Sequence, residues 1–339
     1  MNQSPPTDLD EIRELLRALP GPDREAGAAA AREAQLTKPA GALGRLEELA
    51  HWLAMWQGRH PPRVERPHAA VFAANHGIAA RGVSAYPATV TEQMVRNFID
   101  GGAAVNQLCA VADADLRVYE LALDEPTRDI SEAPAMDEAD CARAIAYGMM
   151  AVEEGIDVLA LGEMGIGNTT SAAALCQGLF GGAAHDWAGR GTGIDDARLA
   201  HKIALIEAAV ARHRVAAHDP LDLLRRLGGF ELAAILGAIM AARLARTPVL
   251  LDGYTCTAAA AVLHALDPGA LDHCQVAHVS CEPGHGRLLK RLEKRALLDF
   301  DMRLGEGSGA VLAIPLLKAA CACHDGMATF AEANVSGPA

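Results

Sequence analysis

The sequence predicts an α/β protein: a mostly parallel, Rossmann-like sheet flanked by helices, with a small helical domain built from both termini. Short apolar runs that end in glycine and polar residues alternate with alanine-rich helical stretches between about residues 67 and 285. This alternation is typical of βαβ units. The runs are continuously apolar, as in strands that are buried on both faces. Residues 1–66 and 286–339 have a helical pattern instead.

The length and composition agree with a folded chain of more than one domain. At 339 residues the chain exceeds the usual size of a single domain, and 51% apolar against 22% charged residues argues against disorder. We therefore expect an α/β domain over 67–285, which holds the active-site cleft, and a small helical domain from 1–66 and 286–339.

The N-terminal segment shows its helical pattern most clearly over residues 43–56. Leu43, Leu46, Leu49, Leu53 and Trp56 recur at spacings of three and four residues. Such spacing places apolar side chains on one face of a helix. The following PPRVERP contains three prolines, which makes it a plausible domain boundary.

Five apolar runs are expected to form the strands of the sheet. In chain order they are HAAVFAANHG (68–77), DLRVYELAL (115–123), IDVLALGEMGIGN (156–168), TPVLLDGYT (247–255) and HCQVAHVSCEPGH (273–285). Polar clusters follow four of them directly, at 75–76, 163–168, 252 and 282–285. Ligands of open α/β sheets bind outside the carboxyl ends of the strands. The clusters therefore predict one cleft at that edge.

Charge and patterning exclude several classes of function. Thirty basic against 43 acidic residues give a formal charge of -13, and aromatic content is 4%, which together argue against nucleic-acid binding. The N-terminus has no apolar signal region, and runs such as 233–242 are far shorter than the ~20 residues that span a bilayer. The eight cysteines include no CxxC pair. We expect a cytoplasmic protein with reduced thiols, no metal site and no membrane partner.

The strongest motif that the residues alone reveal is GEMGIGNTTSAAAL at 162–175. Its glycines leave a strand, Asn168 or Thr169 can cap, and a helix follows. Free backbone N–H groups and the positive end of the helix make such a junction an anion site. A glycine turn that serves only packing is the alternative.

A second glycine-rich turn, GRGTGIDD, occupies residues 189–196, and Lys202 follows one helical stretch later. The two turns and the lysine could hold a sugar phosphate between them. Taken alone, the second turn is as well explained by packing.

Three further residues have two interpretations each. Glu306, in LGEGSGAVLAIPLL (304–317), precedes an apolar helix. It is either a charge at the helix N-terminus or a catalytic carboxylate in the cleft, where burial would raise its pKa. His76 and His285 are candidate general bases, but lone histidines are more often hydrogen-bonded structural residues. Residue pattern alone thus predicts an α/β enzyme acting on a small phosphorylated substrate.

Read together, these segments resemble the nicotinate-nucleotide–dimethylbenzimidazole phosphoribosyltransferase family, usually called CobT. LTKPAGALGRLEELA, NHGIAARGVSAYPATVTEQM, GGAAVNQL, ALGEMGIGNTTSAAAL, GRGTGIDD, SCEPGH, MRLGEGSGAVLA and TFAEANVSG occur in the order and at the spacing of the family. The resemblance runs from about residue 32 to 338. It implies transfer of ribose 5-phosphate from nicotinate mononucleotide to 5,6-dimethylbenzimidazole, without a cofactor, by a homodimer.

The resemblance also implies roles for individual residues. Glu306 matches the family's general base, and Glu163 matches a carboxylate that lines the same pocket. Ser84 and Gln93 match residues that contact the benzimidazole. The positions that match the phosphate- and ribose-binding region are Gly165, Gly167, Asn168, Thr169, Gly191, Thr192, Gly193 and Lys202.

Two alternative functions stay open at the level of sequence. A phosphoribosyltransferase of the same family could use another base, such as adenine or a phenol. A nucleotide-binding sensor without turnover would bind nucleotide and release no nicotinate, but it would leave Glu306 without a task.

Overall fold

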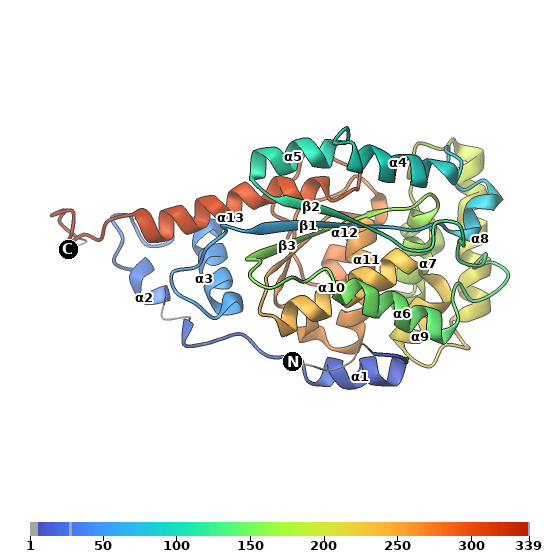
Figure 1. The fold of residues 1–339 in the computed structure, drawn as a ribbon, viewed down its shortest axis with the longest axis horizontal. Coiled ribbons are helices and arrows are strands. Elements are labelled where there is room, and N and C mark those ends of the chain that lie inside the picture. The colour runs from blue at the N-terminus through green and yellow to red at the C-terminus, as the bar shows by residue number, and fades with distance from the viewer. Residues whose placement is uncertain (1–5, 27–28, 338–339) are drawn as a thin grey trace.

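A computed structural model describes residues 6–26 and 29–337. Five parallel strands form one sheet in the order β2-β1-β3-β4-β5 (Figure 1). The strands are β1 (Pro67–Ala73), β2 (Asp115–Glu120), β3 (Val158–Met164), β4 (Val249–Leu251) and β5 (Cys274–Val276). Each lies in or at the start of one of the five apolar runs, so the predicted parallel sheet is confirmed.

Helices follow the strands and cover the sheet (Figure 1). The α-helices are α1 (Leu9–Arg17), α2 (Ala29–Glu33), α3 (Arg45–Gln57), α4 (Thr89–Ile99), α5 (Ala104–Ala112), α6 (Glu138–Met149), α7 (Asn168–Phe180), α8 (Asp196–His213), α9 (Pro220–Leu227), α10 (Phe230–Leu244), α11 (Tyr254–Leu266), α12 (Pro283–Arg291) and α13 (Ser308–Gly326). The architecture is therefore the α/β fold that the sequence predicts.

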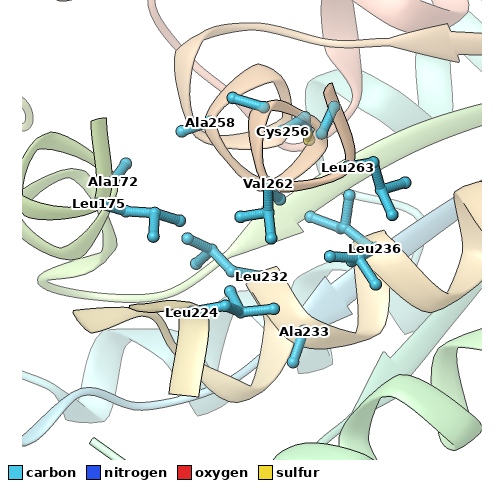
Figure 2. Close-up of a cluster of buried hydrophobic side chains, with 14 of the residues drawn as sticks. Ala172, Leu175, Leu224, Leu232, Ala233, Leu236, Cys256, Ala258, Val262 and Leu263 are labelled. Atoms are coloured by element: carbon cyan, nitrogen blue, oxygen red, sulfur yellow. The ribbon is translucent and has the colours of Figure 1, made fainter. Parts of the chain in front are cut away.

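Each face of the sheet supports its own hydrophobic core. Alternate residues of the central strands, such as Phe72 and Leu161, pack into the core beneath α6, α7, α10 and α11. Their neighbours Val71 and Ala160 point to the core formed with α3, α5 and α13. Figure 2 shows side chains of the first core, where α7, α9, α10 and α11 meet. Burial on both faces explains why the strands are continuously apolar.

The edge strand β2 differs from this pattern. Its residues are exposed or half-buried, whereas every residue of β1 is buried. The other edge strand, β5, is mostly buried, so the position at the edge does not by itself expose β2. Because β2 is incompletely covered, it tolerates the polar residues Asp115, Arg117 and Glu120.

The terminal helices lie in two places. The helices α3 and α13 pack against each other, and the first turns of α13 also contact β3 and β4. The far end of α13 extends away from the sheet beside α2 (Figure 1). The helix α1 instead packs against α6, on the other face. The division into a domain of 67–285 and a small helical domain stays a prediction.

The order of the strands sets the position of the site. The chain moves from β1 outward to β2 and then returns to β3 on the opposite side of β1. The order thus reverses between β1 and β3, and ligands of doubly wound sheets bind at such a point. Phe72 of β1 lies opposite Glu163 of β3 in the register, so both strands end at this edge.

Candidate active site

A cavity of about 360 Å³ opens at the carboxyl edge of the sheet. Its wall is built from segments that follow strands β1, β3, β4 and β5, together with residues 303–305 before α13. The predicted site residues that line it are Ser84, Glu163, Gly165, Gly167, Asn168, Thr169, Gly191 and Thr192. Residues from distant parts of the sequence therefore meet where the strand order reverses.

Four predicted site residues do not line this cavity. Gly193 lines an adjoining cavity of about 340 Å³, which also includes Gly191. Gln93 is exposed on α4. Lys202 and Glu306 are buried; Lys202 contacts the lining residue Thr169, and Glu306 follows the lining residue Gly305 in the chain.

The two glycine-rich turns meet beside the cavity. The turn 165–169 leads into the first turn of α7, and Gly167, at φ +99°, is the residue before that helix. The turn 189–193 approaches it through Gly191, whose φ of +51° is in the left-handed region. Backbone N–H groups at the start of α7 favour an anion at this junction.

Lys202 joins the two turns from beneath. Its Nζ donates to the Thr169 hydroxyl at 2.8 Å and to the Gly189 carbonyl at 3.1 Å. The side chain is fully buried, and this burial lowers the pKa of Lys202 to about 8 against the opposing effect of the nearby Glu282 carboxylate. In the structure Lys202 therefore positions the turns and does not line the cavity.

Replacement of Lys202 by Met keeps most of the buried volume and removes the charge that holds both turns. We expect the dissociation constant for nicotinate mononucleotide, the nucleotide that the family resemblance implies, to rise by the equivalent of about 1–3 kcal/mol when measured by calorimetry. Lys290→Ala, on the exposed face of α12, is the control. Unchanged affinity in the Lys202 variant would contradict a role in binding.

Glu163 brings the first buried carboxyl group to the cavity. It lies near the end of β3 and accepts a hydrogen bond from the Asn168 side chain. Desolvation, followed by the charges of Asp252 and Glu231, raises the pKa of Glu163 to about 8. At neutral pH this carboxyl group is therefore mostly protonated.

Glu306 lies in an unusual backbone conformation next to Glu163. Gly305, Glu306 and Gly307 have φ values of +83°, +62° and +77°, so three successive residues are left-handed. The N–H of Glu306 donates to the carbonyl of Glu163 at 3.2 Å. Gly162 permits this approach, because a Cβ on it would lie 2.3 Å from the backbone nitrogen of Gly307.

Glu306 is 7% exposed and follows Gly305, which lines the cavity. Desolvation, with a further contribution from the charge of Asp252, raises the pKa of Glu306 to about 7. Among the described residues we find no hydrogen bond to its carboxylate. A desolvated carboxylate without a protein partner, with a pKa near neutrality, is suited to general-base chemistry.

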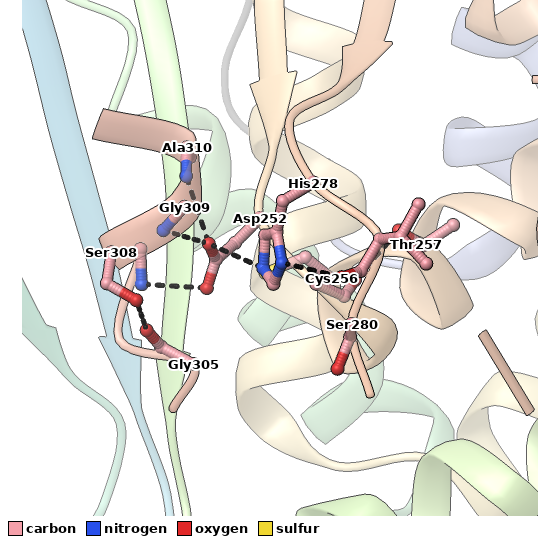
Figure 3. Close-up of polar contacts among 12 residues, drawn as sticks. Asp252, Cys256, Thr257, His278, Ser280, Gly305, Ser308, Gly309 and Ala310 are labelled. Carbon is pink, nitrogen blue, oxygen red and sulfur yellow. Dashed lines mark hydrogen bonds and ion pairs between the residues drawn. The ribbon is translucent and has the colours of Figure 1, made fainter. Parts of the chain in front are cut away.

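Asp252 holds the turn that carries Glu306 (Figure 3). Its buried carboxylate accepts from the N–H groups of Gly307, Gly309 and Ala310 at 3.1, 2.7 and 3.0 Å. Asp252, which follows β4, thus caps α13, since the N-cap residue Gly307 has no side chain to do so. His278 Nε2 lies 3.5 Å from the same carboxylate. Because Asp252 precedes its partners by more than fifty residues, no local sequence pattern shows this contact.

Among the described residues, Glu306 makes no cap hydrogen bond to α13, and its catalytic role stays a prediction. The carboxylate that accepts the N–H groups at the start of α13 belongs to Asp252, whereas Glu306 precedes the cap residue Gly307.

The two candidate histidine bases are both buried outside the cavity wall. His76 lies between the Ser171 hydroxyl, at 3.0 Å, and the Glu231 carboxylate, at 2.6 Å. His285 accepts from the N–H of Ser280 at 2.9 Å, and burial lowers the pKa of His285 to about 3. These contacts favour the structural interpretation of both residues.

Ser84 also lines the cavity, and it lies on the segment between β1 and α4. Its hydroxyl is 3.0 Å from the Thr192 hydroxyl, and the N–H of Ala85 donates to the same Thr192 oxygen at 3.0 Å. The segment that resembles a benzimidazole-binding loop is thus joined to the second glycine-rich turn.

In residues 6–26 and 29–337, no group of three or more His, Cys, Asp and Glu side chains is arranged to hold a metal ion. In the same ranges, no helix has the length and apolar content to cross a membrane.

Comparison with known proteins agrees with the fold. The model of a family described as "Phosphoribosyltransferase" matches residues 19–335, so the chain belongs to the class of phosphoribosyltransferases. Nicotinate-nucleotide–dimethylbenzimidazole phosphoribosyltransferases of Methylocella silvestris and Rhizobium meliloti are 58% and 59% identical to it, over 97% of each chain. The chain belongs to the nicotinate-nucleotide–dimethylbenzimidazole phosphoribosyltransferase family.

A solved structure supports the same assignment. The crystal structure of CobT from Thermus thermophilus is 43% identical in sequence and superposes with a TM-score of 0.86. The match covers 93% of this chain and 100% of that one. The family resemblance inferred from the motifs is confirmed.

Proposed function

We propose that this protein transfers ribose 5-phosphate from nicotinate mononucleotide to 5,6-dimethylbenzimidazole, forming α-ribazole 5'-phosphate and nicotinate. The observation that supports this most strongly is 58–59% identity, over 97% of the chain, to relatives named for these substrates. The product is the nucleotide of the lower ligand of cobalamin, so the reaction belongs to that branch of biosynthesis.

Glu306 is the proposed general base. As one benzimidazole nitrogen attacks C1′ of the ribose, Glu306 takes the proton from the other nitrogen. Nicotinate leaves from a pyridinium ring and needs no proton, so one base and good positioning suffice. Attack on the face opposite the leaving group converts the β-linked nucleotide into the α-linked product.

Glu163 is the second proposed carboxyl group in the pocket. Its protonated form, favoured at neutral pH, is a hydrogen-bond donor and leaves Glu306 to carry the negative charge. Two neighbouring carboxyl groups in different surroundings can take different roles in one reaction.

The remaining predicted contacts are proposed by subsite. Ser84 and Gln93 hold the base; Gln93 is exposed outside the lining of the cavity, so it would have to approach. The two glycine-rich turns hold the ribose and phosphate, and these residues are Gly165, Gly167, Asn168, Thr169, Gly191, Thr192 and Gly193. Lys202 supports them from beneath.

The activity should depend on pH through Glu306. A base must be deprotonated to act, and the pKa of Glu306 is raised to about 7. We expect kcat/KM for the nucleotide to rise with pH through about this value and to fall on the acid side with the ionised fraction of Glu306. The small residual rate of Glu306→Gln should lack this acid limb. A wild-type profile that stays flat across neutrality would contradict the assignment.

Incubation with nicotinate mononucleotide and dimethylbenzimidazole, followed by mass detection of α-ribazole phosphate, tests the proposed function. Competition among dimethylbenzimidazole, adenine and a phenol would reveal a family member that prefers another base. Tight nucleotide binding with no released nicotinate would instead indicate a sensor. A homodimer, a cytoplasmic location, and function without metal, nucleic acid or membrane stay predictions; the charge of -13 favours the absence of nucleic acid.

A further inference from the structure

The wall of the cavity contains little positive charge. Among its described lining residues, Arg303 is the one lysine or arginine, whereas Glu163 and Glu282 both contribute carboxyl groups. The proposed nucleotide substrate brings a phosphate and a carboxylate into this space. A buried anion needs charged or N–H partners, so these two anionic groups require a source of positive charge near the cavity.

The second glycine-rich turn already has a carboxylate on it. Glu282 Oε1 accepts from the N–H of Gly191 at 2.9 Å, and the side chain is 7% exposed. Among the described residues, its Oε2 has no hydrogen-bond partner. A phosphate that enters beside Gly191 would therefore meet the negative charge of Glu282, and Gly191 could not offer its N–H without displacing that side chain.

The other cations near the turn are already engaged. Lys202 is fully buried, and its Nζ contacts Thr169 and Gly189. Arg190 forms an ion pair with Asp196 and donates to the carbonyl of Ile194 at 2.9 Å. It lines the adjoining cavity and not the one at the sheet edge.

Arg303 is exposed and close to the turn. Its Nη1 donates to the carbonyl of Gly191 at 3.1 Å, so the guanidinium lies against the predicted anion site. The backbone beside it is fixed, because the N–H of Cys281 donates to the carbonyl of Met302 at 3.0 Å. Two residues further along, this segment reaches Gly305 and Glu306. A guanidinium has five N–H donors, of which the contact with Gly191 uses one.

We propose that Arg303 binds the phosphate of the nucleotide substrate, facing the turns that Lys202 holds. This inference rests on the proposed function for the identity of the substrate. The guanidinium can grip two phosphate oxygens at once and offset the charge of Glu282. It thereby completes an anion site of which backbone turns and the start of α7 form the other part.

Binding of three ligands to Arg303→Gln, measured by calorimetry, tests the proposal. The ligands are nicotinate mononucleotide, nicotinate riboside, which lacks the phosphate, and nicotinamide mononucleotide, which lacks the carboxylate. We expect both nucleotides to bind about 10- to 100-fold more weakly, the range for a charged hydrogen bond, and the riboside to bind as it does to wild type. Arg303→Lys, which keeps the charge and loses the two-pronged contact, should lie between.

Arg198→Gln is the matched control, because it removes the same charge from an exposed position on α8, outside the lining of both cavities. It should leave the affinity for the nucleotides within about threefold of wild type, as expected for an exposed charge that solvent screens. An equal loss in both arginine variants would show that only the general charge matters and would overturn the proposal. So would an equal loss for nucleotide and riboside, a loss confined to the two nicotinate ligands, or nucleotide affinity unchanged in Arg303→Gln.

These measurements do not depend on turnover. If wild type binds the nucleotides and Arg303→Gln loses them, the inference holds even if dimethylbenzimidazole gives no product, in which case the proposed function alone fails. If wild type binds no nucleotide, both fail.

Discussion

Replacement of Glu306 by Gln should lower turnover by about 10²–10⁴, the usual contribution of a positioned general base. The amide keeps the shape of the side chain and removes the oxygen that accepts the proton. Because the left-handed backbone at residues 305–307 persists, nucleotide affinity and folding should change little. The measurement is direct detection of α-ribazole phosphate under saturating substrates, together with nucleotide binding by calorimetry.

Glu154→Gln is a suitable control, because Glu154 is exposed in the turn before β3, at the opposite edge of the sheet from the cavity. Its activity should equal that of wild type. If Glu306→Gln retains activity within a few-fold of wild type, Glu306 is not the base. Glu163 would then be the candidate, since its carboxyl group is desolvated in the same pocket.

Much of the fold could be predicted because its determinants are local. Strands buried on both faces need continuous apolar runs, and the runs around Phe72 and Leu161 show this directly in the sequence. The glycine and polar residues that follow the strands are also a local pattern, and they predicted the position of the cleft. The edge strand β2 departs from the pattern because it is incompletely covered, and its cover depends on packing between distant segments, which no local segment of the sequence shows.

The parts of the site that could not be predicted depend on contacts between distant segments. In the sequence, Lys202 is a basic residue that follows two glycine-rich turns. Only the fold shows that it is buried and holds both turns from beneath. Arg303 attracts no attention in the sequence, since an exposed arginine before a glycine-rich loop is common. Its relation to Gly191 arises from folding alone.

The interpretation of Glu306 also depends on a contact with a distant segment. An acidic residue just before a helix is usually read as a charge at the helix N-terminus. Asp252 takes the cap contacts here, and this leaves the Glu306 carboxylate without a partner among the described residues. Asp252 holds the turn and Glu306 is the proposed base, so we expect a second large effect when Asp252 is replaced.

Replacement of Asp252 by Asn should destabilise the protein and disable catalysis together. The buried carboxylate accepts from three N–H groups with its two oxygens, whereas the amide has one acceptor oxygen and brings N–H donors toward other donors. Loss of charged hydrogen bonds at a buried helix end should cost about 2–3 kcal/mol of unfolding free energy. Asp8→Asn, at the exposed cap of α1, should cost about 1 kcal/mol or less and leave activity unchanged.

The effect of Asp252→Asn on catalysis should exceed what stability explains. If the turn at residues 305–307 shifts by about 1 Å, the rate of the folded enzyme should fall about 10²-fold, because proton transfer requires a close approach. The pH profile provides a second readout. The charge of Asp252 helps to raise the pKa of Glu306, so its removal should move the acid limb to lower pH. Denaturant unfolding gives the stability change, and kcat against pH, measured well below the melting temperature, gives the rest. If the variant is destabilised but keeps the wild-type kcat and the wild-type acid limb, Asp252 serves only to hold α13. The helix cap would then have no part in the chemistry of Glu306.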